Sequence, residues 1–150
     1  MRFAFYINDM ANTSTISFLG GTETVTGSNF LLQSEDLPAQ QQAGKKMRIL
    51  IVCGFFQGCT DEKLCVDENV SSFPFDPKSI DAVIITHGHI DHIGRVPKLV
   101  REGFRGQIIS TPPTKDFAHE LLLDSEKILS NEAKDCGEEK MYGLEEVEGL

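Results

Sequence analysis

A chain of 150 residues, 40% hydrophobic and 25% charged, has the composition of a soluble globular domain. No apolar run approaches the roughly 20 residues of a membrane-spanning helix, and Met1 to Ile7 is too short and too polar at its flanks for a signal peptide. The four cysteines lack Cys-x-x-Cys spacing. This pattern predicts a reduced, cytoplasmic setting rather than a disulfide framework.

The net charge of -9 is unevenly distributed along the chain. Residues 116–150 contain 3 Lys and Arg against 11 Asp and Glu, whereas residues 1–115 are almost neutral. The acidic character therefore belongs to the C-terminal stretch. It argues neither for nor against a nucleic-acid substrate.

The N-terminal half predicts a β-rich arrangement. We expect residues 1–13 to be an extension, with Met10 an equally possible start, and residues 14–150 to be one domain or a piece of a larger one. The β-prone runs Thr15–Leu19 and Val25–Gln33 flank Gly20-Gly21 and predict a hairpin. Residues 35–46 predict an exposed loop and Met47–Val52 a buried strand. Phe55 and Phe56 then lie between glycines, in a tight loop that we expect to pack under the site described below.

The C-terminal half predicts alternating helices and strands. The expected elements are a short helix from Thr60 to Asn69, an extended connection over 71–77, a strand over 80–85, a helix from about Asp91 to Glu102, a strand over 107–110 and a long helix from Thr111 to about Asp135. Pro97 favours a kink or a late start of the second of these helices. The long helix carries an apolar stripe of helical period, interpreted as core contact, comprising Phe117, Leu121, Leu122, Ile128 and Leu129. His119, among them, is interpreted as structural or exposed.

Three of the four histidines and one aspartate lie within six positions, directly after the apolar strand that ends at Ile85. His87 and His89 are two residues apart and would face the same way in an extended turn. Asp91 and His92 follow as the chain enters a helix. Imidazole nitrogens and carboxylate oxygens are ligands that Zn²⁺ prefers, with Mn²⁺ or Fe²⁺ as alternatives. The pattern predicts part of a two-metal site.

A non-metal interpretation exists, in which these histidines cap the next helix and hydrogen-bond the backbone. Four ligand-type residues in six positions favour the metal. Strands first, followed by strand–helix units and a metal loop, predict an α/β fold of the αβ/βα layered kind. A Rossmann fold is disfavoured because Gly20-Gly21 does not begin a Gly-x-Gly-x-x-Gly motif that opens a helix.

The motif His87-x-His89-x-Asp91-His92 resembles the second motif of the metallo-β-lactamase fold. Other stretches narrow the resemblance to the N-terminal part of the β-CASP subgroup of RNA-processing nucleases. These stretches are 18–28, Gly54-Phe55-Phe56-Gln57-Gly58, 73–77, 94–100 and Ser110-Thr111-Pro112.

The resemblance implies two zinc ions bridged by a hydroxide that attacks an RNA phosphodiester. His87 and His89 would bind the first zinc, and Asp91 and His92 the second. Asp91 would also be catalytic, orienting the attacking water. A metal lowers the pKa of bound water from about 15.7 to about 7 and offsets charge that develops on phosphorus.

Two departures from the family pattern matter. Val52 stands where the family has an aspartate that supports the metal loop, a role typically worth about 10–100-fold in affinity or activity. The family's later metal ligands, its inserted β-CASP domain and its C-terminal half have no counterpart here. Each metal would then have two protein ligands, where catalytic zinc sites have three. We therefore expect this chain alone to bind zinc weakly and to cleave poorly, the full-length parent being the enzyme.

Two other functions compete with a ribonuclease. One is an ester or thioester hydrolase that uses the same metal motif, and the other is a catalytically inactive RNA-processing scaffold. Arg95, Lys98, Arg101 and Arg105 would contact RNA phosphates or form a solvated helix face, the latter being favoured. The identity of the RNA, the mode of cleavage and the oligomeric state are left open.

Overall fold

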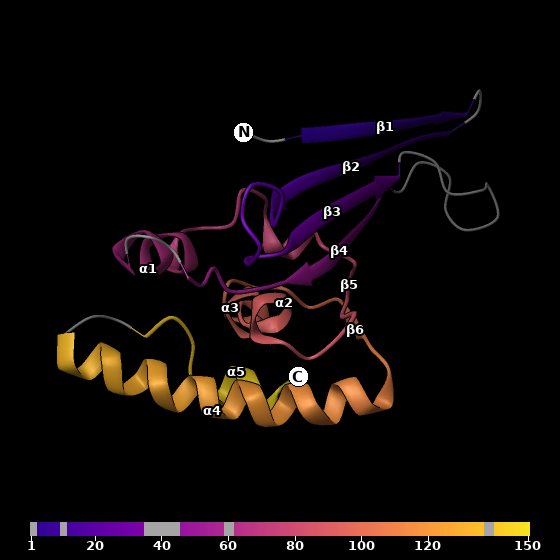
Figure 1. Ribbon diagram of the computed structural model, residues 1–150. Helices are drawn as coiled ribbons and strands as arrows, with labels where there is room; N and C mark the ends of the chain where they lie inside the picture. Colours follow the sequence, from indigo (N-terminus) through magenta and orange to yellow (C-terminus); the bar gives the residue numbers. More distant parts are fainter. Residues whose placement is uncertain (1–2, 10–11, 35–45, 59–61, 137–139) are drawn as a thin grey trace.

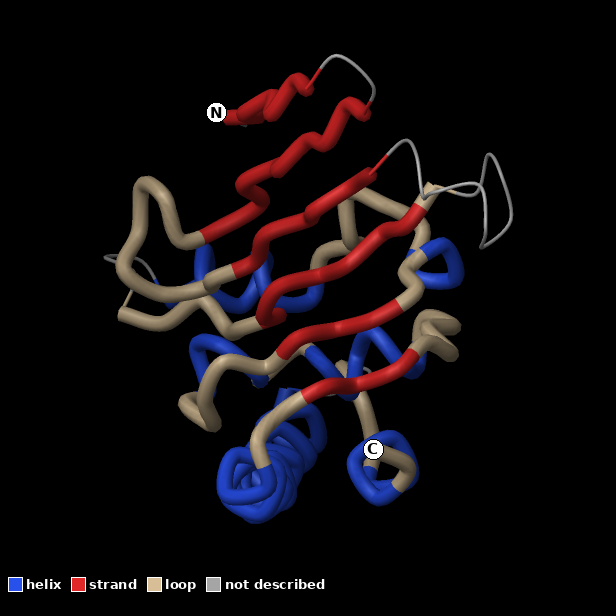
Figure 2. Tube along the Cα trace, turned by 90° about the vertical axis from the view of Figure 1, so that its right-hand side faces the viewer, coloured by secondary structure: helices blue, strands red, loops and turns tan. Residues whose placement is uncertain are grey.

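A six-stranded mixed sheet in the order β1-β2-β3-β4-β5-β6 forms the centre of the computed structural model, which describes residues 3–9, 12–34, 46–58, 62–136 and 140–150 (Figures 1 and 2). The strands from β1 to β4 are antiparallel, and β4, β5 and β6 are parallel. The strands are β1 Phe3–Asp9, β2 Asn12–Gly20, β3 Asn29–Ser34, β4 Met47–Cys53, β5 Ala82–Ile84 and β6 Gln107–Ile109.

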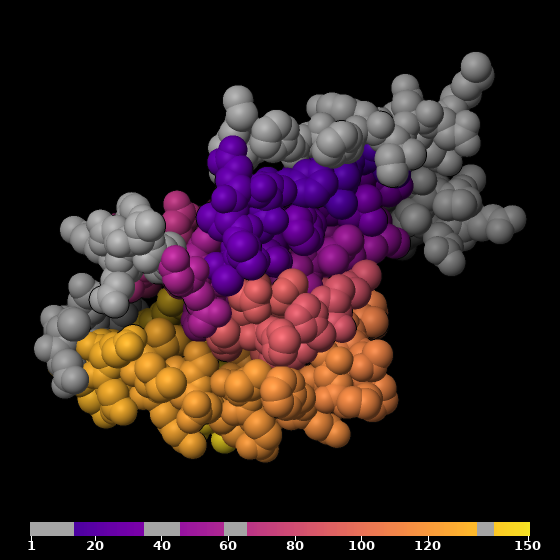
Figure 3. Space-filling view, in the orientation of Figure 1, coloured from indigo at the N-terminus to yellow at the C-terminus, as the bar shows by residue number. Residues whose placement is uncertain are grey.

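Helices cover the parallel half of this sheet. They are α1 Glu62–Val70, α2 Ile90–Ile93, α3 Val96–Arg101, α4 Pro112–Cys136 and α5 Leu144–Glu148, with a 3-10 turn at Pro77–Ser79. Helix α2 contacts both β4 and α4, and α3 contacts α5. The short helices α2 and α3 therefore lie between the sheet and the long helix α4 (Figure 1). On the surface, too, residues from the middle of the chain separate the N-terminal strands from α4 (Figure 3). This arrangement confirms the predicted layered α/β fold.

The core lies between the parallel strands and the short helices. Leu50 of β4 is directly opposite Val83 of β5, and neither side chain is exposed. Ile93 of α2 and Leu99 of α3 cover them from one face and are equally buried. The connections between parallel strands cross over one face of the sheet and place helices there, so the side chains on that face are buried. The histidine loop, residues 85–92 from the end of β5 into α2, is thus anchored at both ends in the core.

Most predicted elements are confirmed, with shifted ends. The helix expected over Asp91 to Glu102 is two helices, because Gly94 and Arg95 separate α2 from α3 and Pro97 lies in the first turn of α3. The long helix and the hairpin are present, with Gly21 at a φ of 73° in the hairpin loop. The loop at 35–46, apart from its last residue, and the ends predicted at Thr60 and Gly137 lie outside the described residues. Within the expected extension, Phe3–Asp9 pairs with β2 along its whole length.

Two interpretations of side chains are wrong at particular residues. The apolar stripe of α4 contacts the core through Leu122, Leu121 and Leu129. Phe117 and Ile128 do not belong to it, because they are 53% and 51% exposed. Arg95 and Lys98 are not on a solvated face. Both are buried, and both cations lie over the ring of Phe73, at 4.5 and 4.6 Å from its centroid. They also donate hydrogen bonds to the Ser71 carbonyl, so desolvation is offset by cation–π and hydrogen-bond contacts.

Arg101 and Arg105 are exposed and donate to backbone carbonyls. Within the described ranges, no helix has the length and apolarity needed to cross a membrane.

Candidate metal centre

The loop between β5 and α2, together with the first turn of α2, carries every residue of the predicted site. Strand β5 ends at Ile84, and the Ile85 N–H donates to the Ile109 carbonyl of β6 at 2.8 Å. His87 and His89 follow in irregular backbone, and Asp91 and His92 lie inside α2. His89 is the N-cap residue of α2, but its side chain makes no capping hydrogen bond. The helix-capping interpretation therefore has no support at this residue.

The loop brings the three imidazoles together. The ring centroid of His87 lies 4.8 Å from that of His89 and 4.0 Å from that of His92. Asp91 joins the cluster, with its Oδ2 atom 3.4 Å from Nε2 of His92. His87 thus lies against both other imidazoles of the cluster, and Asp91 joins it through His92.

The backbone of this loop is held from below by two segments that are distant in sequence. The Asp91 carbonyl accepts a hydrogen bond from Ser28 N–H at 3.1 Å, and the Ser28 carbonyl accepts one from Gly54 N–H at 3.0 Å. The Phe55 N–H donates to the Ile90 carbonyl at 3.1 Å. These bonds satisfy backbone groups that burial would otherwise leave unpaired.

Gly54 allows this close approach. An ideal Cβ atom at Gly54 would lie 1.5 Å from the Asp91 carbonyl oxygen, so a side chain there is incompatible with the observed backbone. Phe55, the next residue, packs against Gly94, and its ring is stacked with that of Tyr142 at a centroid distance of 6.4 Å. The prediction that this loop packs under the site is confirmed.

His92 is the most constrained of the three imidazoles. Burial lowers its pKa below the usual 6.5, with Asp91 opposing the shift and His87 and His89 adding to it. Its Nδ1 atom is buried and has no hydrogen-bond partner among the described residues. His87 differs, because its Nδ1 lies 3.0 Å from the Thr86 hydroxyl. The net effect of this environment is to favour the neutral imidazole, the form in which histidine binds metals.

The donor set fits zinc in kind but is not complete. Within the described part of the chain, no three His, Cys, Asp or Glu side chains converge so as to hold a metal ion. Burial raises the pKa of the nearby Cys53 thiol to about 12, so Cys53 supplies no thiolate at neutral pH.

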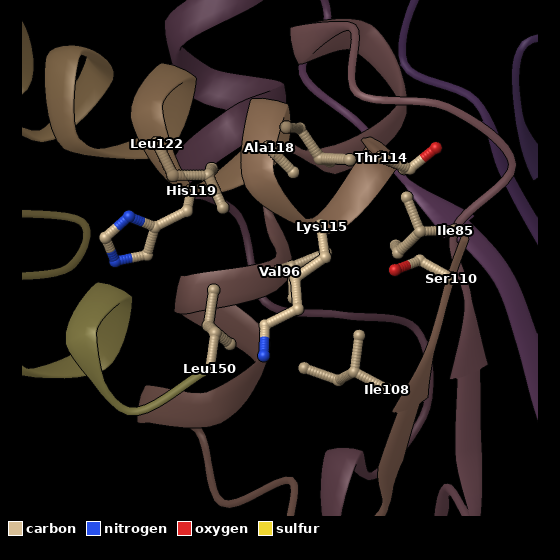
Figure 4. A pocket seen from close by; sticks show the side chains of 11 residues that line it. Ile85, Val96, Ile108, Ser110, Thr114, Lys115, Ala118, His119, Leu122 and Leu150 are labelled. Carbon is tan, nitrogen blue, oxygen red and sulfur yellow. The ribbon is translucent and has the colours of Figure 1, made fainter. Parts of the chain in front are cut away.

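The fourth histidine belongs to a different place. His119 lies on α4 at the rim of a mainly apolar cavity of about 170 Å³, which Val96, Ile108 and Leu150 also line. In Figure 4 the His119 ring points away from Ile85 and Ser110 on the opposite side of this cavity. The side chain is exposed, as predicted, and takes no part in the histidine cluster.

Sequence reasoning missed two neighbours of the cluster. Thr86 directly precedes the first histidine, and a hydroxyl beside a ligand-type residue is a signal that could have been used. Phe117 is 29 positions after Gly88, and its Cδ1 atom would lie 2.6 Å from a Cβ atom placed on that glycine. Only the fold shows that this ring contacts the loop.

Comparison with known proteins agrees with this geometry. The chain is 39% identical to the ribonuclease TTHA0252 of Thermus thermophilus over 129 residues, 86% of this chain and 25% of that protein. It is 36% identical to the transcription termination factor FttA of Methanosarcina mazei, over 79% of this chain and 17% of the factor. It is 32% identical to cleavage and polyadenylation specificity factor subunit 3-II of Arabidopsis thaliana, over 66% of this chain and 16% of that subunit.

The chain spans a quarter or less of the length of these relatives. The family model of the metallo-beta-lactamase superfamily matches residues 58–134, about half of the chain, and this range includes the whole histidine loop. The chain therefore belongs to the metallo-β-lactamase superfamily.

Proposed function

We propose that this chain is the N-terminal part of a β-CASP ribonuclease, a metal-dependent hydrolase of RNA phosphodiester bonds. The observation that carries the proposal is the cluster of three imidazoles and one carboxylate on the loop after β5. Relatives named as a ribonuclease, a transcription termination factor and a cleavage factor subunit support RNA as the substrate. A cytoplasmic protein is part of the same proposal.

In this proposal His87 and His89 hold one zinc ion, and Asp91 and His92 hold a second. Bound zinc supplies an activated water at neutral pH and offsets the negative charge that develops on the phosphate. The chain's own part is to orient the donors. The backbone bond from Ser28 fixes the start of α2, and burial lowers the pKa of His92 and so favours its neutral form. Asp91 has a second role, as the acceptor that orients the attacking water.

The proposal extends to the domain organisation. Residues 14–150 are the N-terminal part of a larger catalytic domain, since the relatives are about four to six times longer than the matched stretch. The remaining ligands come from the rest of that domain. The isolated chain therefore binds zinc weakly and has little activity.

A zinc titration followed by NMR of the imidazole rings tests the metal assignment. We expect the resonances of His87, His89 and His92 to shift together, with a dissociation constant in the micromolar range or weaker. His119 is an internal control because it lies outside the cluster, and its resonances stay in place. Two tight equivalents would contradict the incomplete site, and unchanged cluster resonances would contradict the metal site itself.

The substrate class needs a second measurement. With zinc and excess chain, we expect slow cleavage of a labelled RNA that is lost in Asp91→Asn and after chelation. Hydrolysis of a thioester without RNA cleavage would instead favour an ester or thioester hydrolase.

One observation favours the scaffold as a second candidate. Val52 has a φ of 55°, a left-handed conformation that is a genuine outlier for a β-branched residue. It occupies the position where the family has an aspartate, while the buried Nδ1 of His92 lacks a partner among the described residues. A chain that binds RNA, binds no zinc and cleaves nothing would support the scaffold.

A further inference from the structure

An exposed aromatic ring lies directly beside the histidine loop. Phe117 on α4 is 53% exposed, although large apolar side chains are usually covered. A Cβ atom placed on Gly88 would lie 2.6 Å from Phe117 Cδ1 and 3.5 Å from Cε1. Gly88 is the residue between His87 and His89, so one edge of the ring rests on the loop while more than half of the side chain faces solvent.

The same helix offers a comparison. Ile128 is 51% exposed and lies 11 residues further along α4, about 16 Å along the helix axis. It lines an open groove with Leu121 and Val66, and this groove reaches Ile90 of α2 but has no histidine in its lining. Phe117 therefore combines two features that Ile128 lacks, an aromatic face and contact with the proposed metal loop.

We propose that Phe117 is a stacking platform for a nucleobase of the RNA next to the phosphate held at the histidine cluster. The inference rests on the proposed function and specifies how the substrate is bound. Single-stranded RNA is recognised mainly by stacking of splayed bases on aromatic side chains, which tolerates any base because each has a π face. The contact with Gly88 places the platform one residue from each of His87 and His89.

The charges around Phe117 favour a base over a phosphate. Asp116 and Glu120 are exposed neighbours on α4 and repel the RNA backbone, whereas a neutral base is indifferent to them. Lys115 is directed elsewhere, into the lining of the cavity shown in Figure 4. Binding at Phe117 should therefore release few counterions.

The chain contains no tryptophan, so a single substitution creates a specific reporter. We expect the fluorescence of Phe117→Trp, with zinc present, to be quenched by a nuclease-resistant phosphorothioate penta-adenylate. An abasic pentamer of the same charge should quench little. Ile128→Trp, a matched site on the same helix with similar exposure, should respond to neither. Equal quenching at both sites, or none at position 117, would overturn the proposal.

Affinity measurements complete the test. Phe117→Ala should weaken binding of the labelled penta-adenylate roughly 5- to 100-fold, and Phe117→Tyr should retain most of the affinity. The factor lost in Phe117→Ala should be the same at low and high salt, because stacking neutralises no phosphate. A loss that disappears at high salt would contradict stacking.

The two proposals fail in different ways. If zinc shifts the histidine resonances but RNA leaves the fluorescence of Phe117→Trp unquenched, the platform is wrong and the metal site remains. If RNA quenches Phe117→Trp both with zinc and with chelator while zinc shifts no histidine, the chain binds RNA without the proposed metal chemistry.

Discussion

The histidine loop differs between its two sides. We call the side that packs on Ser28, Gly54 and Phe55 the underside, and the side that carries the imidazoles and Asp91 the donor side. On the underside, backbone groups of Ser28, Gly54 and Phe55 are hydrogen-bonded within the protein, and no side chain fits between Gly54 and Asp91. On the donor side, the imidazole of His87 lies against those of His89 and His92, and Nδ1 of His92 has no partner among the described residues. The fold thus fixes the loop's position without a metal, whereas the side chains form an arrangement that further ligands and ions would satisfy.

The most disruptive change is expected on the underside. Gly54→Ala places a methyl group 1.5 Å from the Asp91 carbonyl oxygen, and backbone on both sides must move. We expect unfolding to become easier by about 3 kcal/mol or more, the range of severe core overpacking. Urea denaturation measures the change.

Gly143→Ala is the matched control for Gly54→Ala. A Cβ atom at Gly143 meets only the flexible Glu146 carboxylate, at 3.4 Å, and the φ of -118° suits any residue. Its stability should change by less than about 1 kcal/mol. Similar losses in both variants would mean that the loop is not held by the contact at Gly54.

The next change concerns Val52, which stands where the family pattern has an aspartate. Val52→Asp replaces a β-branched residue at a φ of 55° with one that adopts this conformation more readily, and it restores the carboxylate of the family pattern. We expect zinc affinity, measured by calorimetry, to rise about 10- to 100-fold. Val52→Asn relieves the same backbone strain without adding charge. An equal gain in Val52→Asn would assign the effect to strain rather than to the carboxylate.

A smaller effect is expected at Thr86. Its hydroxyl lies 3.0 Å from Nδ1 of His87, and such a partner would orient the ring and leave Nε2 for the proposed zinc. Thr86→Val keeps the shape and removes the hydrogen bond, so zinc affinity should fall about 10-fold. Thr86→Ser should restore it. If valine and serine behave alike, the hydroxyl does not position His87.

The sequence predicted the parts of this comparison that depend on local spacing. Four ligand-type residues after an apolar strand identified the donor side, and glycines around Phe55 indicated a loop packed beneath it. The sequence alone could not reveal features that tertiary contacts create. Phe117 follows the helical period of a core residue yet is exposed, because α4 presents that position at the edge of the histidine loop rather than toward the sheet.

The prediction for Arg95 and Lys98 was wrong in the opposite sense, because these charged residues were expected to be exposed and are buried. Charged residues on a short helix favour a solvated face, but the turn before the 3-10 segment brings the Phe73 ring and the Ser71 carbonyl to them. These contacts join residues more than 20 positions apart, and local patterns do not encode them.

The smallest effect expected is the pH dependence of His92. Because burial lowers its pKa below 6.5, the unfolded chain takes up this proton at a higher pH than the folded chain. The stabilising contribution of neutral His92 is therefore complete above pH 6.5 and is lost as the pH falls from 6.5 toward the lower folded value. Thermal unfolding from pH 7.5 to 5.5 should show a decline that is weaker in His92→Gln and unchanged in His119→Gln. The difference between the two variants will be small, because the His92 side chain is still partly exposed to solvent. If both variants show the same decline with pH, burial of His92 does not contribute to the pH dependence of stability.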